Sequence, residues 1–86
     1  MYAATKGAVL LDVRTPGEFS GGTIKGARNI NYMDSKFAKT IEGLDKDKTY
    51  FVFCRSGGRS AGACNTMGKL GFTAYNLSGG IGAWPN

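Results

Sequence analysis

One seven-residue segment concentrates the side chains that could carry out chemistry in this chain. It combines a thiol, two cations, two adjacent glycines and two hydroxyls, in the order Cys54, Arg55, Ser56, Gly57, Gly58, Arg59 and Ser60. A short glycine-rich turn lets successive backbone N–H groups point inward, and a helix that begins there adds a partial positive charge. These donors and the two arginines favour thiolate over thiol. We therefore predict that Cys54 is a nucleophile whose pKa lies below that of an ordinary cysteine.

The absence of histidine narrows the chemistry further. The 86-residue chain contains no histidine and two cysteines. Ser-His-Asp triads, Cys-His pairs and histidine-ligated metals are therefore excluded, and two cysteines do not make a four-cysteine zinc site. We predict no metal and no cofactor. The 14 glycines are about twice the average share, which is typical of tight turns and of loops whose amides face a ligand.

The second cysteine has different neighbours along the chain. Cys64 shares a helical stripe with Ala61, with Met67 or Gly68, and with Gly71, at spacings of three to four residues, which is typical of a packed helix face. We interpret Cys64 as a core residue. The alternative is a resolving thiol that forms a disulfide with Cys54, which their separation along the chain permits.

Short apolar runs alternate with amphipathic stretches. The runs at residues 8–13 and 50–53 are those expected of buried parallel strands, and residues 27–30 and 73–77 predict two further strands. The stretches between them predict helices. This alternation favours an α/β fold, in which one domain over residues 1–86 has a small, mainly parallel sheet with helices on both faces.

The expected helices have recognisable ends. Thr15 and Glu18 bracket a proline in a capping-box pattern, so a short helix should begin at residue 16. Asp34 or Ser35 can cap a second helix. A third should run from about residue 58 to 70 and end at Gly71 in the left-handed conformation. The second helix has an apolar stripe at spacings of four and three, formed by Phe37, Ile41 and Leu44.

Two of the expected loops lie where a site is most easily built. In parallel sheets, ligands bind beyond the carboxyl ends of the strands. The loop after the first strand begins with Arg14, and the loop after the run at 50–53 begins with Cys54. The fold pattern therefore places both residues at the carboxyl edge of the sheet.

Four motifs in this order resemble those of the single-domain rhodaneses, a family of sulfurtransferases. They are VLLDVRTPGEF at 9–19, GTIKGARNIN at 22–31, CRSGGRS at 54–60 and LSGGIGAW at 77–84. The resemblance covers nearly the whole chain. It implies a rhodanese-like three-layer fold, in which Gly79 and Gly80 would allow close backbone approach beside the site, with Trp84 packing below.

The resemblance also implies a role for each matching residue. Cys54 would take a sulfane sulfur from a donor such as thiosulfate and become a persulfide. It would then yield the sulfur to cyanide, a thiol or a protein acceptor. The backbone amides of residues 55–60 would cradle the outer sulfur, and Arg55 and Arg59 would attract the anionic donor. Two residues at the end of the first strand would brace the site, namely Asp12 and Arg14.

Two features depart from the family pattern. Family members usually have a histidine at the position of Thr23, so the contact which that histidine makes is left open. Residues 1–8 alone precede the first motif, where family members commonly have a further strand and helix. The expectation is either a minimal domain or one trimmed from a longer chain.

Two other functions fit the same elements. A cysteine-dependent phosphatase or arsenate reductase also uses a thiolate at a strand end, an amide nest and an arginine. In that family five residues separate cysteine from arginine, whereas four separate Cys54 from Arg59, and the shorter loop suits a single sulfur atom. A persulfide carrier module would hold the same sulfur and give it only to a protein partner, which the sequence does not distinguish.

Charge and hydropathy limit the classes of partner that the chain is expected to have. The net charge of +5 indicates a solvated basic surface or attraction of small anions. No basic helix face points to nucleic acid, and no apolar run is long enough to span a membrane. We expect neither as a partner, and we expect a soluble protein in the cytoplasm, where a reactive thiolate stays reduced. An exported origin stays open if a signal sequence has been removed.

Overall fold

The computed structural model describes residues 7–55 and 57–77, and in this part of the chain it forms a four-stranded sheet. All neighbouring strands are parallel, in the order β2-β1-β3-β4. Along the chain the elements are β1 (Ala8–Asp12), α1 (Pro16–Ser20), β2 (Arg28–Asn29), α2 (Phe37–Glu42), β3 (Thr49–Phe53), α3 (Gly58–Lys69) and β4 (Thr73–Asn76).

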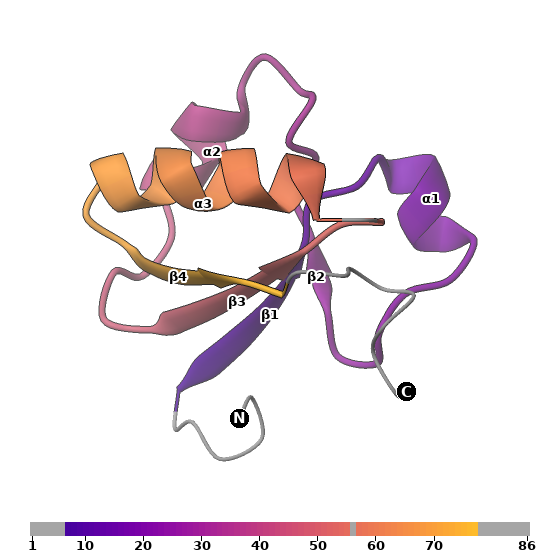
Figure 1. Cartoon of the computed structure of the whole chain (residues 1–86), viewed down its shortest axis with the longest axis horizontal. Coiled ribbons are helices and arrows are strands. Elements are labelled where there is room, and N and C mark those ends of the chain that lie inside the picture. Colours follow the sequence, from indigo (N-terminus) through magenta and orange to yellow (C-terminus); the bar gives the residue numbers. More distant parts are fainter. Residues whose placement is uncertain (1–6, 56, 78–86) are drawn as a thin grey trace.

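The central strands β1 and β3 bury side chains on both faces of the sheet, because successive residues of a strand point to opposite sides. Figure 1 shows α2 and α3 over the same face. The buried cluster that these helices form with the sheet includes Leu11, Ile41, Val52, Cys54 and Met67. A second buried cluster contains Leu10, Phe51 and Phe53 of the central strands together with Ile24, which lies between α1 and β2.

The predicted α/β class with a small parallel sheet is confirmed. Each of the four predicted strands is present, although β2 is reduced to Arg28–Asn29. Figure 1 shows α1 beyond the carboxyl ends of the central strands, at the edge where the loop after β3 also lies. No helix of the described residues is long and apolar enough to cross a membrane.

Two helix boundaries follow their sequence signals. The Oγ1 of Thr15 accepts a hydrogen bond from the Glu18 amide at 3.3 Å, and Glu18 Oε1 accepts from the Thr15 amide at 3.1 Å, which completes the predicted capping box. At the other helix, α3 ends at Lys69, one residue before the predicted end. Gly71 has a φ of 91°, the left-handed conformation expected after the helix.

The predicted start of α2 is wrong by one to two residues. The carboxylate of Asp34 accepts from the Lys36 amide at 2.8 Å, so it closes a local turn instead of capping a helix. The helix then begins at Phe37 and has no side-chain cap. Its apolar stripe is nevertheless placed as expected, since Phe37 and Ile41 are buried.

Candidate active site

Cys54 lies immediately after β3, at the carboxyl edge of the sheet. The residue is 1% exposed and belongs to the cluster beneath α2 and α3. Its Sγ accepts a hydrogen bond from the backbone N–H of Gly57 at 3.0 Å. Gly57 has a φ of 101°, a conformation that side chains rarely adopt, so glycine is what allows the chain to turn back toward the sulfur. The loop thus presents a backbone donor to the thiol.

The helix that follows adds positive potential near the thiol. Because α3 begins at Gly58, its first amides lie in the loop that starts at Cys54, and a helix start favours negative charge. The pKa of Arg59 is raised, chiefly by its hydrogen bonds to Glu18, with a smaller contribution from the charge of Cys54. Arg59 and Cys54 are therefore electrostatically coupled.

Arg59 is held by α1. Its two terminal nitrogens donate to the two carboxylate oxygens of Glu18, at 2.8 and 3.1 Å, in a bidentate pair. This pair is the main reason that the pKa of Glu18 falls to about 2, and the Thr15 amide is the next cause. The sequence predicted Glu18 only as a capping residue. In the structure it also fixes the position of the Arg59 guanidinium.

The pair of residues predicted to brace the site forms a buried ion pair at the end of β1. Asp12 is fully buried, and its carboxylate accepts from the Arg14 amide and guanidinium at 2.8 to 3.1 Å. The Asp12 hydrogen bond is also the main cause that raises the pKa of Arg14. Arg14 donates in addition to the Gly22 carbonyl at 2.5 Å, and the Asn29 side chain donates to the backbone carbonyls of both Asp12 and Arg14. The pair therefore ties together three segments.

Thr23, the position where the resemblance leads one to expect histidine, contributes to the same network. Its hydroxyl donates to Asp12 Oδ2 at 2.8 Å. A donor to the buried carboxylate is therefore present at this position even without an imidazole.

The remaining predicted loop residues differ in their environments. Arg55 is exposed, whereas Ser60 is fully buried at the inner side of α3. Gly58 is exposed and starts the helix. Ser56 lies outside the described residues, as do the predictions for residues 79, 80 and 84.

Sequence reasoning missed Asn76 at the end of β4. Its side chain accepts from the Ser60 hydroxyl at 2.5 Å and donates to the Gly57 carbonyl at 3.3 Å. Asn76 could have been found from the sequence as a polar residue at the carboxyl end of the strand next to β3. A strand's last residue lies at the edge where the loop of Cys54 was expected.

The stripe predicted around Cys64 is only partly right, because Ala61 is exposed and the buried residues of α3 are Ser60, Ala63 and Met67. Cys64 lies at the edge of the core, where it is partly buried and packs against the cluster beneath α3. Burial raises its pKa to about 11. No disulfide joins Cys64 to Cys54, and both residues are in the described part of the chain.

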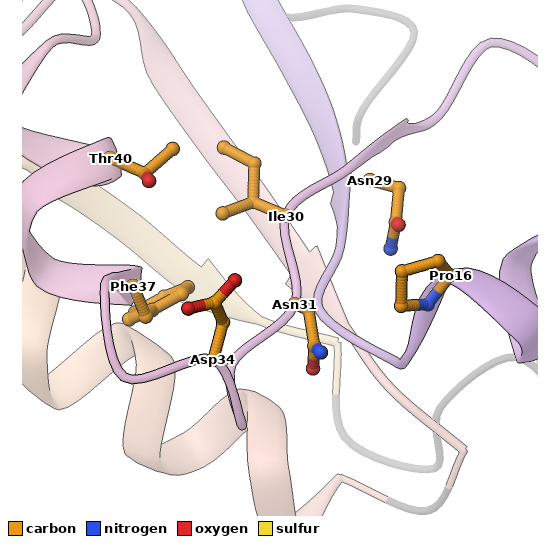
Figure 2. A pocket seen from close by; sticks show the side chains of 7 residues that line it. All are labelled: Pro16, Asn29, Ile30, Asn31, Asp34, Phe37 and Thr40. Carbon is orange, nitrogen blue, oxygen red and sulfur yellow. The ribbon is translucent and has the colours of Figure 1, made fainter.

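A pocket of about 230 Å³ lies apart from the Cys54 loop. Figure 2 shows Pro16 and Asn29 on one side of it and Phe37 with Thr40 of α2 on the other. None of its lining residues belongs to the segment 54–60. Its connection to the thiol site is indirect. Asn29 bonds the backbone on either side of Val13, and the Val13 amide donates to the carbonyl of Phe53, the residue before Cys54.

These features define an α/β domain in which a cysteine at the carboxyl edge of a parallel sheet opens a glycine-rich loop that presents a backbone N–H to its sulfur. Residues 2–86, nearly the whole chain, match the sequence model of the rhodanese-like domain family. The protein belongs to the rhodanese-like domain family.

Relatives and solved structures agree with this assignment. The chain is 42% identical over 83 residues to the uncharacterized protein YqhL of Bacillus subtilis, covering 95% of this chain and 64% of YqhL. It is 41% identical over 75 residues to the putative sulfurtransferase YtwF of the same organism, covering 87% of this chain and 71% of YtwF. The crystal structure of a rhodanese-related protein from Thermoplasma volcanium superposes with a TM-score of 0.82 at 37% identity, covering 92% of this chain and 77% of that chain.

Proposed function

We propose that this domain is a sulfurtransferase that carries sulfur as a persulfide on Cys54. The observation that supports it most directly is the Cys54 sulfur, which accepts the Gly57 N–H at 3.0 Å in a loop that opens α3. A thiolate there has the Gly57 N–H aimed at it before any substrate arrives. Relatives named as sulfurtransferases support sulfur transfer in general.

The proposed reaction has two displacements. In the first, the Cys54 thiolate attacks the outer sulfur of thiosulfate, a sulfur–sulfur bond forms, and sulfite leaves with the electron pair of the broken bond. In the second, cyanide or a thiolate attacks the outer sulfur of the persulfide, and the Cys54 thiolate leaves. Negative charge passes from one sulfur to the next in both steps, so preorganised amides serve both without a dedicated proton donor.

Partners and location follow from the same chemistry. The donor is a small anion or a persulfide, and the acceptor is cyanide, a thiol or a thiol-bearing protein. We place the reaction in the cytoplasm, because the mechanism requires a reduced thiolate and that compartment maintains it.

Intact-protein mass spectrometry tests the proposal. After incubation with thiosulfate, the mass should rise by one sulfur atom, and cyanide should remove this sulfur. Cys54→Ser should show no gain, whereas the matched variant Cys64→Ser should gain sulfur like the wild type. Failure of the wild type to gain sulfur, together with steady hydrolysis of an aryl phosphate, would contradict the proposal and favour a phosphatase.

A second outcome would separate an enzyme from a carrier. Turnover with cyanide or small thiols supports a sulfurtransferase. Loading of Cys54 without discharge to any small acceptor would instead favour a module that delivers sulfur to a protein.

A further inference from the structure

Asn76 connects the end of β4 to the loop that carries Cys54. It is partly buried, and its backbone pairs with Val52 of the neighbouring β3, two residues before the cysteine. Its carboxamide reaches the Ser60 hydroxyl with Oδ1 and the Gly57 carbonyl with Nδ2. One side chain therefore contacts both the glycine turn that follows Cys54 and the first helical turn of α3.

The Ser60 hydroxyl proton and both lone pairs of the Gly57 carbonyl are used within this small network. A serine hydroxyl has one proton, and the Ser60 oxygen lies 2.5 Å from Asn76 Oδ1 but 3.1 Å from the Gly57 carbonyl. The shorter contact takes the proton. The two lone pairs of the Gly57 carbonyl are then used by the Ala61 amide, at 3.0 Å, and by the amide group of Asn76, at 3.3 Å.

Holding this carbonyl determines where the next amide points. The described part of the chain has no cis peptide, and in a planar trans peptide the C=O and the following N–H point in opposite directions. With its carbonyl held toward Asn76, the peptide after Gly57 directs the Gly58 N–H the other way. Gly57 is left-handed and Gly58 starts a right-handed helix, and alternation of this kind makes successive N–H groups converge into an anion-binding concavity.

Two adjacent glycines need an outside restraint to keep such a shape. Glycine loses more conformational freedom on ordering than any other residue, and neither Gly57 nor Gly58 has a side chain with which to pack. The Asn76 carboxamide supplies a restraint from a neighbouring strand. We propose that Asn76 is a positioning residue, which holds the Gly57 carbonyl and Ser60 so that the amides of the loop face the sulfur of Cys54.

The inference deepens the proposed function and rests on it for its biological meaning, but its test does not require sulfur transfer. The rate of alkylation by iodoacetamide against pH reports the pKa of the Cys54 thiol, and a Cys64→Ser background leaves one thiol to follow. In that background Asn76→Ala should raise the alkylation pKa by about half a unit to one unit, because the thiolate loses preorganised donors. Asn65→Ala, an exposed asparagine on α3, is the matched control and should leave the profile unchanged.

A second variant keeps the test decisive if Asn76→Ala folds poorly. Ser60→Ala removes the hydroxyl that holds Asn76 Oδ1 and leaves β4 untouched. It should shift the alkylation pKa in the same direction by less, and the double variant should shift it little beyond Asn76→Ala alone, since both changes cut the same link. Alkylation profiles that coincide with the parent, in folded variants, would overturn the inference.

The outcomes for the two proposals are distinguishable. A shifted alkylation pKa in a protein that never gains sulfur from thiosulfate would retain the positioning role and refute the transfer reaction. Where sulfur transfer occurs, Asn76→Ala should lower kcat about tenfold with a smaller change in KM, because the donors act mainly on the charge of the transition state.

Discussion

The two cysteines lie on the same side of the sheet, yet their surroundings are opposite. Cys54 is 1% exposed, and Cys64 is only partly buried on α3. The more deeply buried thiol has a backbone N–H at 3.0 Å from its sulfur and is electrostatically coupled to Arg59. For Cys64, burial is the single cause that acts on the pKa, which rises to about 11.

We expect the more buried thiol to be the reactive one, so burial alone would not set the reactivity of a thiol in this fold. What differs is whether polar groups are aimed at the sulfur. Cys54 follows a strand and precedes a helix, so the loop amides can face it, whereas Cys64 lies within a helix whose amides are used by the helix itself. Position relative to the helix start therefore distinguishes the two thiols.

Replacing each cysteine should give the largest contrast. Cys54→Ser should abolish thiosulfate:cyanide turnover, because no sulfur nucleophile remains in the loop. Cys64→Ser should stay within about twofold of the wild type, since a thiol with a pKa of about 11 is almost entirely protonated near neutral pH. Steady-state assays on both variants, with circular dichroism to show that they fold, would check this. Residual turnover in Cys54→Ser, or a large loss in Cys64→Ser, would contradict the distinction.

Removal of the buried Asp12–Arg14 ion pair should weaken the contrast by destabilising the domain. Asp12→Ala leaves Arg14 buried without its carboxylate, and breaking a buried pair in this way costs about 3–5 kcal/mol. That is a large part of the stability of a small domain. Urea denaturation should show the lower free energy of unfolding. In this variant, which keeps both cysteines, Cys54 and Cys64 should be alkylated at more similar rates than in the wild type. Asp47→Ala, at an exposed position, is the control and should change stability by less than about 0.5 kcal/mol. An equally stable Asp12→Ala would mean that the network is dispensable.

The sequence contained enough local information for the thiol loop and little for what supports it. The end of an apolar strand, two glycines and Gly71 were sufficient to place Cys54 and α3 within one residue. The Glu18–Arg59 pair joins residues 41 positions apart, and the Asn76 contact to Gly57 spans 19. No local pattern specifies such partners. Glu18 was also hidden by its capping role, because one carboxylate performs both tasks.

Substitutions in the Arg59–Glu18 pair should have a smaller effect, and they should affect the reaction at Cys54 without affecting Cys64. Arg59→Ala should lower kcat/KM for thiosulfate about tenfold and that for a neutral persulfide donor by less, since loss of the charge weakens attraction of the anion. Glu18→Gln keeps the cap but releases the arginine, so thiosulfate use should stay within about threefold or rise. Lys69→Ala removes the same charge at the far end of α3 and should have no effect. Equal losses with both donors in Arg59→Ala would indicate a structural role.

The effect that is absent near neutral pH concerns Cys64 and appears only in alkaline solution. Its folded pKa of about 11 exceeds the value of about 8.5 expected for an unfolded cysteine, so the folded state holds the proton more tightly. The corresponding stabilisation is fully present below pH 8.5 and is lost as pH rises toward 11. In a Cys54→Ser background, the free energy of unfolding should therefore fall more steeply between pH 8.5 and 11 when Cys64 is present than in Cys64→Ala. Tyrosine and lysine titrate equally in both proteins and cancel in the difference. Identical slopes would show that solvent reaches the Cys64 thiol, and burial would no longer explain why the two cysteines differ.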